Sequence, residues 1–139
     1  MPGDAYGYHL ILRVSDIERE SLLDDTDSVA QCLASIVSSI GMRILAGPFS
    51  AYQASPEEKQ GCSALVILYE SHAAIHTYAH LREAFLDVFS CRVFDVENVT
   101  ATLSAYLGYY RIAEKVMLQR GLHWSYDIER EMTRWLQAR

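Results

Sequence analysis

A succession of short apolar stretches, each of strand length and bounded by polar or turn-forming residues, constrains the fold of this chain most. The stretch at residues 62–69, which reads CSALVILY, is apolar enough for the centre of a sheet. Gly47-Pro48 interrupts another stretch and indicates an edge strand or a bulge. In all, β-strands are predicted at residues 7–14, 42–52, 62–69, 73–78, 84–93 and 109–119.

Helical spacing of apolar residues appears in three other segments. From Val29 to Ile40 apolar side chains recur at every third or fourth position, and Gly41 follows as a C-cap. Residues 95–107 show the same spacing and end at Gly108. A third helix is predicted at residues 125–138, with these residues mostly on one face: Tyr126, Ile128, Met132, Trp135 and Leu136.

Strands and helices in this order predict a single α+β domain over residues 1–139. We expect a two-layer sandwich in which an antiparallel sheet carries helices on one face, with residues 125–138 as a C-terminal helical extension. A domain of 139 residues, half of them apolar, is marginal on its own. We therefore expect the sheets of two copies to stack in a homodimer.

Charge and cysteine content argue against several classes of protein. A net charge of −6 lacks the basic stripe of a nucleic-acid-binding protein. No apolar run reaches the length of a membrane span, and the first residues lack a signal-peptide pattern, so we expect a cytoplasmic protein without a membrane partner. Cys32, Cys62 and Cys91 fit no zinc spacing, and we expect thiols and no metal.

Reactive side chains are concentrated in residues 69–91. If one strand runs unbroken there, His72 and His76 share a face and Ser71 points the other way, whereas a turn near Ser71 removes that constraint. Composition alone allows a cysteine hydrolase that uses Cys91 with a histidine. It equally allows a metal site built from His72, His76 and His80, or simply a histidine-rich sheet edge. The reactive residues are Glu70, Ser71, His72, His76, Asp87 and Cys91.

The spacing within this segment resembles the processing site of the S-adenosylmethionine decarboxylase family, in its short bacterial and archaeal type. Residues 70–77 read ESHAAIHT, against E-S-H-x-x-I-H-T in the family, and residues 87–91 read DVFSC, against D-x-F-T-C. Ser63 lies eight residues before Ser71, as a serine does in the family. An early G-x-H-L and a late R-G are also matched, so the resemblance covers residues 7–121.

The resemblance implies a self-processing enzyme of polyamine biosynthesis. Ser71 would attack the Glu70 carbonyl, and the chain would separate into a β chain of residues 1–70 and an α chain of residues 71–139. Ser71 would become a covalent pyruvoyl cofactor, which removes CO2 from an α-amino acid through a Schiff base. The family's default substrate is S-adenosylmethionine, and its short members work as homodimers of processed protomers.

The resemblance also implies roles for three further residues. His76 would transfer the proton during processing, and Ser63 would stabilise the ester-forming intermediate. Cys91 would be the acid that reprotonates the α-carbon of the substrate.

The chain departs from the family where the nucleoside is bound. The family continues I-H-T-W-P-E, in which the tryptophan stacks on adenine and the glutamate holds the ribose hydroxyls, whereas this chain has Tyr78, Ala79 and His80. Tyr78 keeps an aromatic face, and Tyr52 is the expected partner of a stacking clamp. His80 cannot accept from two hydroxyls as a carboxylate does, so we expect weaker binding of S-adenosylmethionine.

Two alternatives therefore stay open. One is a decarboxylase of a small basic amino acid, arginine or ornithine, whose cationic end would meet Glu83, Asp87 or another acid. The other is a catalytically silent paralogue that binds or regulates a partner and does not cleave itself. Arg92 also replaces the glycine that usually follows the cysteine.

Overall fold

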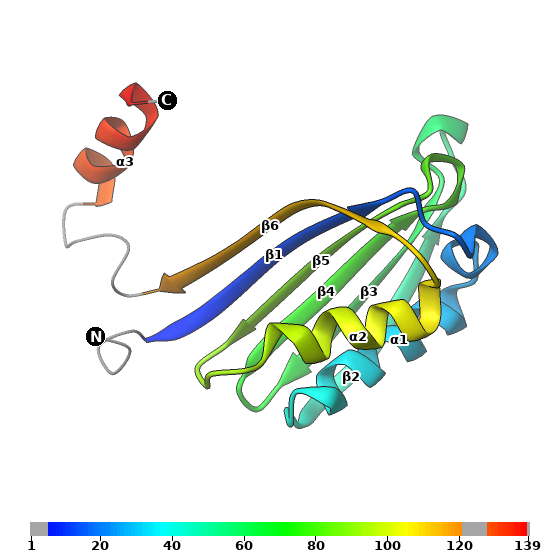
Figure 1. Cartoon of the computed structure of the whole chain (residues 1–139), viewed down its shortest axis with the longest axis horizontal. Helices are drawn as coiled ribbons and strands as arrows, with labels where there is room; N and C mark the ends of the chain where they lie inside the picture. Colours follow the sequence, from blue (N-terminus) through cyan, green and yellow to red (C-terminus); the bar gives the residue numbers. More distant parts are fainter. Residues whose placement is uncertain (1–5, 121–127, 139) are drawn as a thin grey trace.

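The computed structural model describes residues 6–120 and 128–138, and these residues form one antiparallel sheet of six strands. The strands lie in the order β2-β3-β4-β5-β1-β6 (Figure 1). Their bounds are β1 Gly7–Ser15, β2 Ile44–Gln53, β3 Gly61–Leu68, β4 Ser71–Tyr78, β5 Glu83–Ser90 and β6 Arg111–Arg120.

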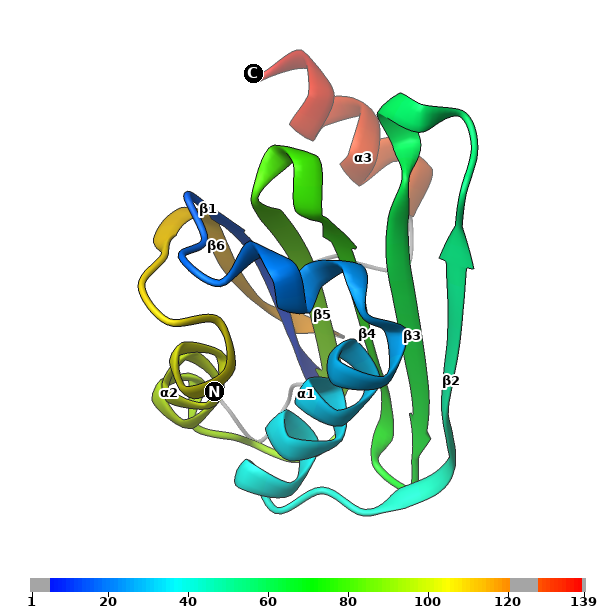
Figure 2. The same cartoon turned by 90° about the vertical axis from the view of Figure 1, so that its right-hand side faces the viewer.

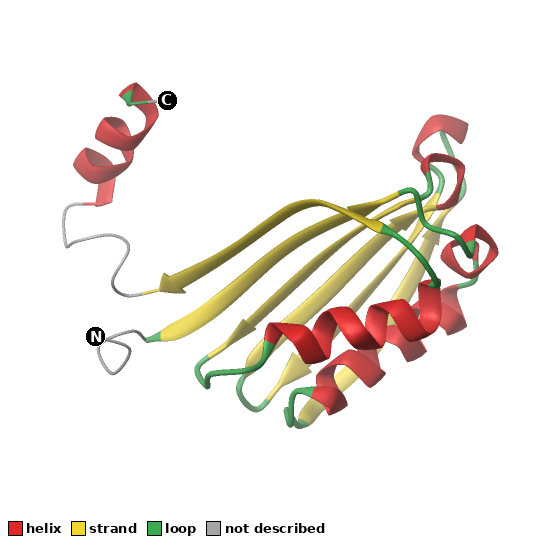
Figure 3. Ribbon diagram, viewed as in Figure 1, coloured by secondary structure: helices red, strands yellow, loops and turns green. Residues whose placement is uncertain are grey.

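Two helices, α1 (Thr26–Ser39) and α2 (Val96–Leu107), lie side by side over one face of the sheet (Figures 2 and 3). Each begins at an aspartate, because the Asp25 and Asp95 carboxylates accept the backbone N–H two residues further on. Their buried side chains pack on the alternate residues of the strands to form the core. We call the opposite, uncovered side the open face.

The predicted α+β fold with helices on one face is confirmed. All six predicted strands are present, and β2 is an edge strand with register shifts around Gly47-Pro48, as the sequence indicates. The predicted strand at residues 84–93 is wrong at its end, because the Ser90 hydroxyl accepts the Arg92 N–H and turns the chain after β5. The sequence did not reveal three short 3-10 helices: η2 (Glu20–Asp24), η3 (Glu57–Lys59) and η4 (Ala79–Leu81).

The predicted C-terminal helix is present as α3 (Ile128–Gln137). Its predicted start, which includes Tyr126, lies outside the described residues. Met132, Trp135 and Leu136 are exposed along it. Figure 1 shows α3 beyond the end of β6 and away from α1 and α2. None of the described helices is long and apolar enough to cross a membrane.

Candidate active site

The Glu70–Ser71 peptide bond lies in the turn between β3 and β4, where the backbone is strained. Ser71 opens β4 with a φ of +151°, a conformation that is almost confined to glycine. For a residue with a Cβ atom such a φ costs about 1–3 kcal/mol, and it persists only where the surroundings hold it. The sequence did not decide whether a turn lies near Ser71, and the structure has one there.

Cys91 lies directly beside this bond. Its backbone N–H donates to the carbonyl oxygen of Glu70 at 3.0 Å, and Ser71 pairs with Ser90 across β4 and β5. A donor on this carbonyl polarises it and would stabilise negative charge on its oxygen during attack. The Cys91 side chain is exposed. The structure therefore brings together three of the predicted residues, Glu70, Ser71 and Cys91.

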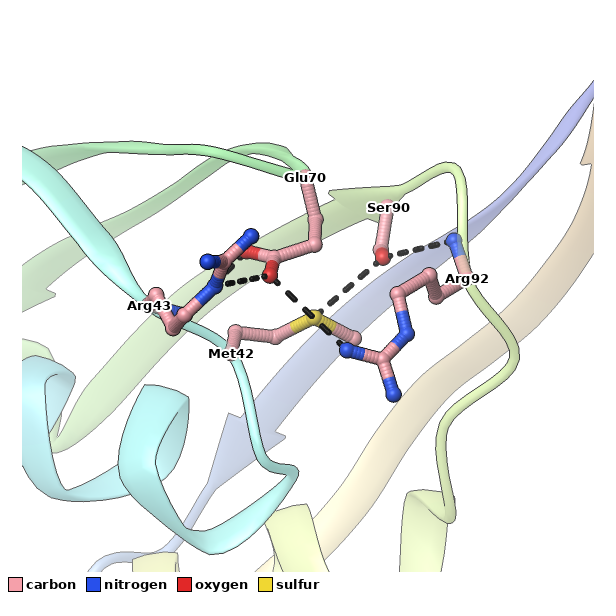
Figure 4. Close-up of polar contacts among 5 residues, drawn as sticks. All are labelled: Met42, Arg43, Glu70, Ser90 and Arg92. Atoms are coloured by element: carbon pink, nitrogen blue, oxygen red, sulfur yellow. Dashed lines mark hydrogen bonds and ion pairs between the residues drawn. The ribbon is translucent and has the colours of Figure 1, made fainter.

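The side chain of Glu70 is only 3% exposed and is held by arginines from two other segments (Figure 4). Arg43 donates its backbone N–H to Oε2 at 3.1 Å and its Nε–H to Oε1 at 3.2 Å, and Arg92 Nη1 lies 3.9 Å from Oε1. The backbone N–H of Arg43, more than any other group, lowers the pKa of Glu70. Arg43 was not predicted from the sequence, because no local pattern places it beside Glu70.

Ser63 and His76 form the second part of the site. They face each other across β3 and β4 on the open face, with Ser63 Oγ 2.8 Å from His76 Nδ1. Along an extended strand the five residue steps from Ser71 to His76 span about 17 Å. Within one chain, the structure therefore does not bring this pair to Ser71.

A shallow pocket of about 360 Å³ adjoins the Ser63–His76 pair on the open face. Apolar side chains dominate its lining, which suits the uncharged part of a small molecule. The residues that line it include Phe49, Ala51, Leu65 and Ala74. Phe49 contributes an aromatic ring from β2 that sequence reasoning did not select.

The expected clamp of Tyr52 and Tyr78 is not formed within one chain. Tyr52 pairs with the buried Cys62 and points to the helix-bearing side, where desolvation and the Asp24 carboxylate raise its pKa. Tyr78 lies on the open face, edge-on to Phe85 at 5.9 Å between ring centroids. The pairing of Tyr52 with Cys62 is the reason, since residues opposite each other on neighbouring strands point to the same face of the sheet.

The two other predicted substrate-binding residues are already engaged. The ring nitrogen Nε2 of His80 lies 2.9 Å from the carbonyl oxygen of Glu58, at the η3 turn. Glu83 accepts from Arg13 Nη2 at 2.6 Å. In the described part of the chain, neither residue forms a hydrogen bond with Ser63 or His76.

A cluster around Phe89 occupies the open face near Ser71. The Arg120 guanidinium lies 4.2 Å from the Phe89 ring centroid, and the rings of His9 and His72 lie within 6 Å. His9 Nε2 is buried and has no hydrogen-bond partner among the described residues; it lies 3.5 Å from Asp87 Oδ1. Desolvation lowers the pKa of His9, although Asp87 opposes the shift. Sequence reasoning noted His9 only as part of a motif.

Histidines and cysteines elsewhere are dispersed. His72 and His76 share the open face, as expected for one strand, whereas His80 lies in η4. Among residues 6–120 and 128–138, no group of three histidine, cysteine or acidic side chains is placed to hold a metal ion. Cys32 and Cys62 are buried, and burial raises the pKa of Cys32 to about 12, so these two thiols belong to the core.

The sequence of this chain also matches a known protein family. A family model described as S-adenosylmethionine decarboxylase matches residues 8–121. The S-adenosylmethionine decarboxylase proenzyme of Methanococcus maripaludis is 34% identical over 85 residues, which cover 61% of this chain and 65% of that protein. This match thus spans slightly less than two thirds of the relative's length.

Two further matches extend over more of the chain. The S-adenosylmethionine decarboxylase proenzyme of Clostridium botulinum is 26% identical over 114 residues, which cover 81% of this chain and 93% of that protein. The crystal structure of the adenosylmethionine decarboxylase from Aquifex aeolicus has the same fold, with a TM-score of 0.68 at 23% identity over 86% of this chain and 93% of that one. The family match ends before α3.

Proposed function

Because the chain belongs to the S-adenosylmethionine decarboxylase family, we propose that it is a self-processing decarboxylase of polyamine biosynthesis whose catalytic group is made from Ser71. One observation carries the proposal. The Glu70–Ser71 bond combines a carbonyl that accepts from the Cys91 N–H with a serine in a strained backbone conformation. Strain and polarisation at the same peptide bond favour its rearrangement.

The processing reaction uses the chain's own atoms. Ser71 Oγ attacks the Glu70 carbonyl carbon, the C–N bond breaks, and the hydroxyl proton passes to the nitrogen, which leaves an ester. Loss of the Cα proton of residue 71 then expels Glu70 as a carboxylate and leaves dehydroalanine. Water converts dehydroalanine into a pyruvoyl group and ammonia. The products are chains of residues 1–70 and 71–139.

The residues present fit a pyruvoyl group at position 71. Such a group supplies an electron sink for decarboxylation, as larger organic cofactors do elsewhere. Cys91 is exposed beside residue 71, where its thiol would hold the proton that replaces the lost carboxylate on the substrate. Processing would also leave a new C-terminal α-carboxylate on Glu70, whose side chain is paired with Arg43.

A homodimer would complete the site. Ser63 and His76 lie on the open face about 17 Å from Ser71 along β4, too far to act on it within one chain. When two open faces stack, the Ser63–His76 pair of one protomer would lie over the Ser71 turn of the other, and His76 would move the proton in processing. The open face carries the exposed apolar side chains that such stacking buries: Phe49, Leu65, Ile67, Phe85 and Val116.

We infer S-adenosylmethionine as the first candidate substrate, since the curated relatives are S-adenosylmethionine decarboxylase proenzymes. A small basic amino acid, arginine or ornithine, is the second. It is favoured by His80, which is bound to the Glu58 carbonyl, and by Asp87, whose side chain is 46% exposed on the open face, whereas Glu83 is already paired with Arg13. An exposed carboxylate there offers a partner for a cationic substrate end.

The test is CO2 release from S-adenosylmethionine, arginine, ornithine and lysine, measured in parallel with the wild type and with Ser71→Ala. We expect release from one substrate by the wild type and none by Ser71→Ala. A folded wild type that releases CO2 from none of the four and stays uncleaved would support the silent paralogue instead.

A further inference from the structure

We propose that Arg43 and Arg92 are positioning residues that hold Glu70 in the geometry from which the Glu70–Ser71 bond is cleaved. The inference rests on the proposed self-processing. It concerns three segments that are distant in sequence and meet at one carboxylate: the residues before β2, the β3–β4 turn, and the turn after β5 (Figure 4).

The Glu70 carboxylate is buried although both of its cationic partners are largely exposed. Its side chain is 3% exposed, against 70% for Arg43 and 64% for Arg92. A buried carboxylate is costly unless it is paired and hydrogen-bonded, so the two arginines hold this side chain inside. Arg43 contacts both carboxylate oxygens, which fixes the orientation of the group as well as its place.

Glu70 is anchored at its backbone too. Its carbonyl oxygen accepts from the Cys91 N–H at 3.0 Å, on the same turn that carries Arg92. That turn is itself fixed, because Ser90 Oγ accepts the Arg92 N–H at 2.9 Å and donates to Met42 Sδ at 3.4 Å. Side chain and carbonyl together orient the peptide plane that ends at Ser71.

The contacts of the Glu70 side chain and carbonyl would keep Ser71 in its strained conformation. A φ of +151° on a serine persists only where neighbouring contacts over-determine it. If the Glu70 side chain is released, the peptide can rotate and Ser71 can relax toward an ordinary extended conformation. Its hydroxyl is then no longer held in a fixed orientation relative to the Glu70 carbonyl, and formation of the ester slows.

The experiment follows cleavage of newly synthesised full-length chains in a cell-free translation system, by gel over time. The variants are Arg43→Gln, Arg92→Gln and the two lysine replacements. Arg111→Gln is the matched control, since Arg111 forms an exposed pair with Asp16 at 3.5 Å, outside the site. We expect each glutamine variant to cleave about tenfold more slowly, lysine variants to be intermediate, and Arg111→Gln to match the wild type.

Two further measurements separate positioning from stability. The same replacements in an uncleavable Ser71→Ala background give melting temperatures, which we expect to stay well above the temperature of the cleavage assay. Hydroxylamine cleaves an ester but not the peptide bond, and we expect it to release no extra product from the glutamine variants, because their ester does not form. Hydroxylamine-sensitive accumulation of uncleaved chain would place the defect in a later step and overturn the proposal.

Cleavage of both glutamine variants at the wild-type rate would also overturn it. If the glutamine variants do not fold, the lysine variants decide, and their cleavage at the wild-type rate would refute the positioning role. A wild type that never cleaves would refute the proposed function itself, which is a different outcome.

Discussion

At the scale of single residues, the backbone N–H and the side chain of Cys91 can be tested separately. Its backbone N–H donates to the Glu70 carbonyl, and its exposed side chain lies beside residue 71. In the proposed reaction the first of these would serve processing, and any residue with a backbone N–H would supply it. The second would serve turnover, for which a side chain that can donate a proton is needed.

We therefore expect Cys91→Ala to self-cleave at close to the normal rate and to lose about a hundredfold or more in decarboxylation, the usual contribution of a general acid. Gel analysis measures the cleavage, and CO2 release from the preferred substrate measures the turnover. Near-normal turnover with unchanged product would show that the acid lies elsewhere.

The sequence was informative about residues that follow one another in a motif. Residues 70–77 and 87–91 identified Glu70, Ser71 and Cys91, and the structure brings these together. The face of Tyr52 could not be predicted, because it depends on the register in which β2 pairs with β3, where Tyr52 lies opposite Cys62. Arg43 could not be found either, since it meets Glu70 only through the tertiary fold.

At the scale of elements, apolar periodicity located the strands and both core helices but not all of their ends. The end of β5 depends on a side-chain hydrogen bond of Ser90, and the start of β4 depends on a strained serine. Neither signal is visible in a hydropathy pattern. The helix α3 was predicted from its own periodicity, and it lies beyond the stretch that the family matches.

We expect a chain that ends at residue 121 to fold and to self-cleave at the wild-type rate. The described contacts of Glu70, Ser71 and Cys91 come from β3, β5, the residues before β2 and the turns after β3 and β5, and none of them involves α3. The measurement is the time course of cleavage for the truncated and the full chain. A truncated chain that melts normally but does not cleave would show that α3 contributes to the site.

At the scale of the whole molecule, the site is divided between the two ends of β4. Ser71 opens the strand, and His76 lies five residues further along it with Ser63 opposite. The helix-bearing face is buried in the core, whereas the open face carries several exposed apolar side chains and no described helix covers it in one chain. Both facts are explained if two copies stack through their open faces.

Hybrid dimers test this arrangement. A Ser71→Ala chain and a His76→Ala chain, each inactive in processing alone, are mixed or expressed together with tags of different size. We expect the His76→Ala chain to be cleaved in the mixture, because its intact Ser71 meets His76 of the partner. Cleavage of neither chain in a folded hybrid would indicate that each chain processes itself with its own His76.

The most direct test of self-processing is the intact mass of the purified, folded protein. We expect two chains, one of residues 1–70 and one of residues 71–139 that is lighter by one ammonia than the same residues with a free N-terminal serine. Ser71→Ala should give a single uncleaved chain. A wild-type protein that is folded and yet keeps the full mass of 139 residues would contradict the central claim.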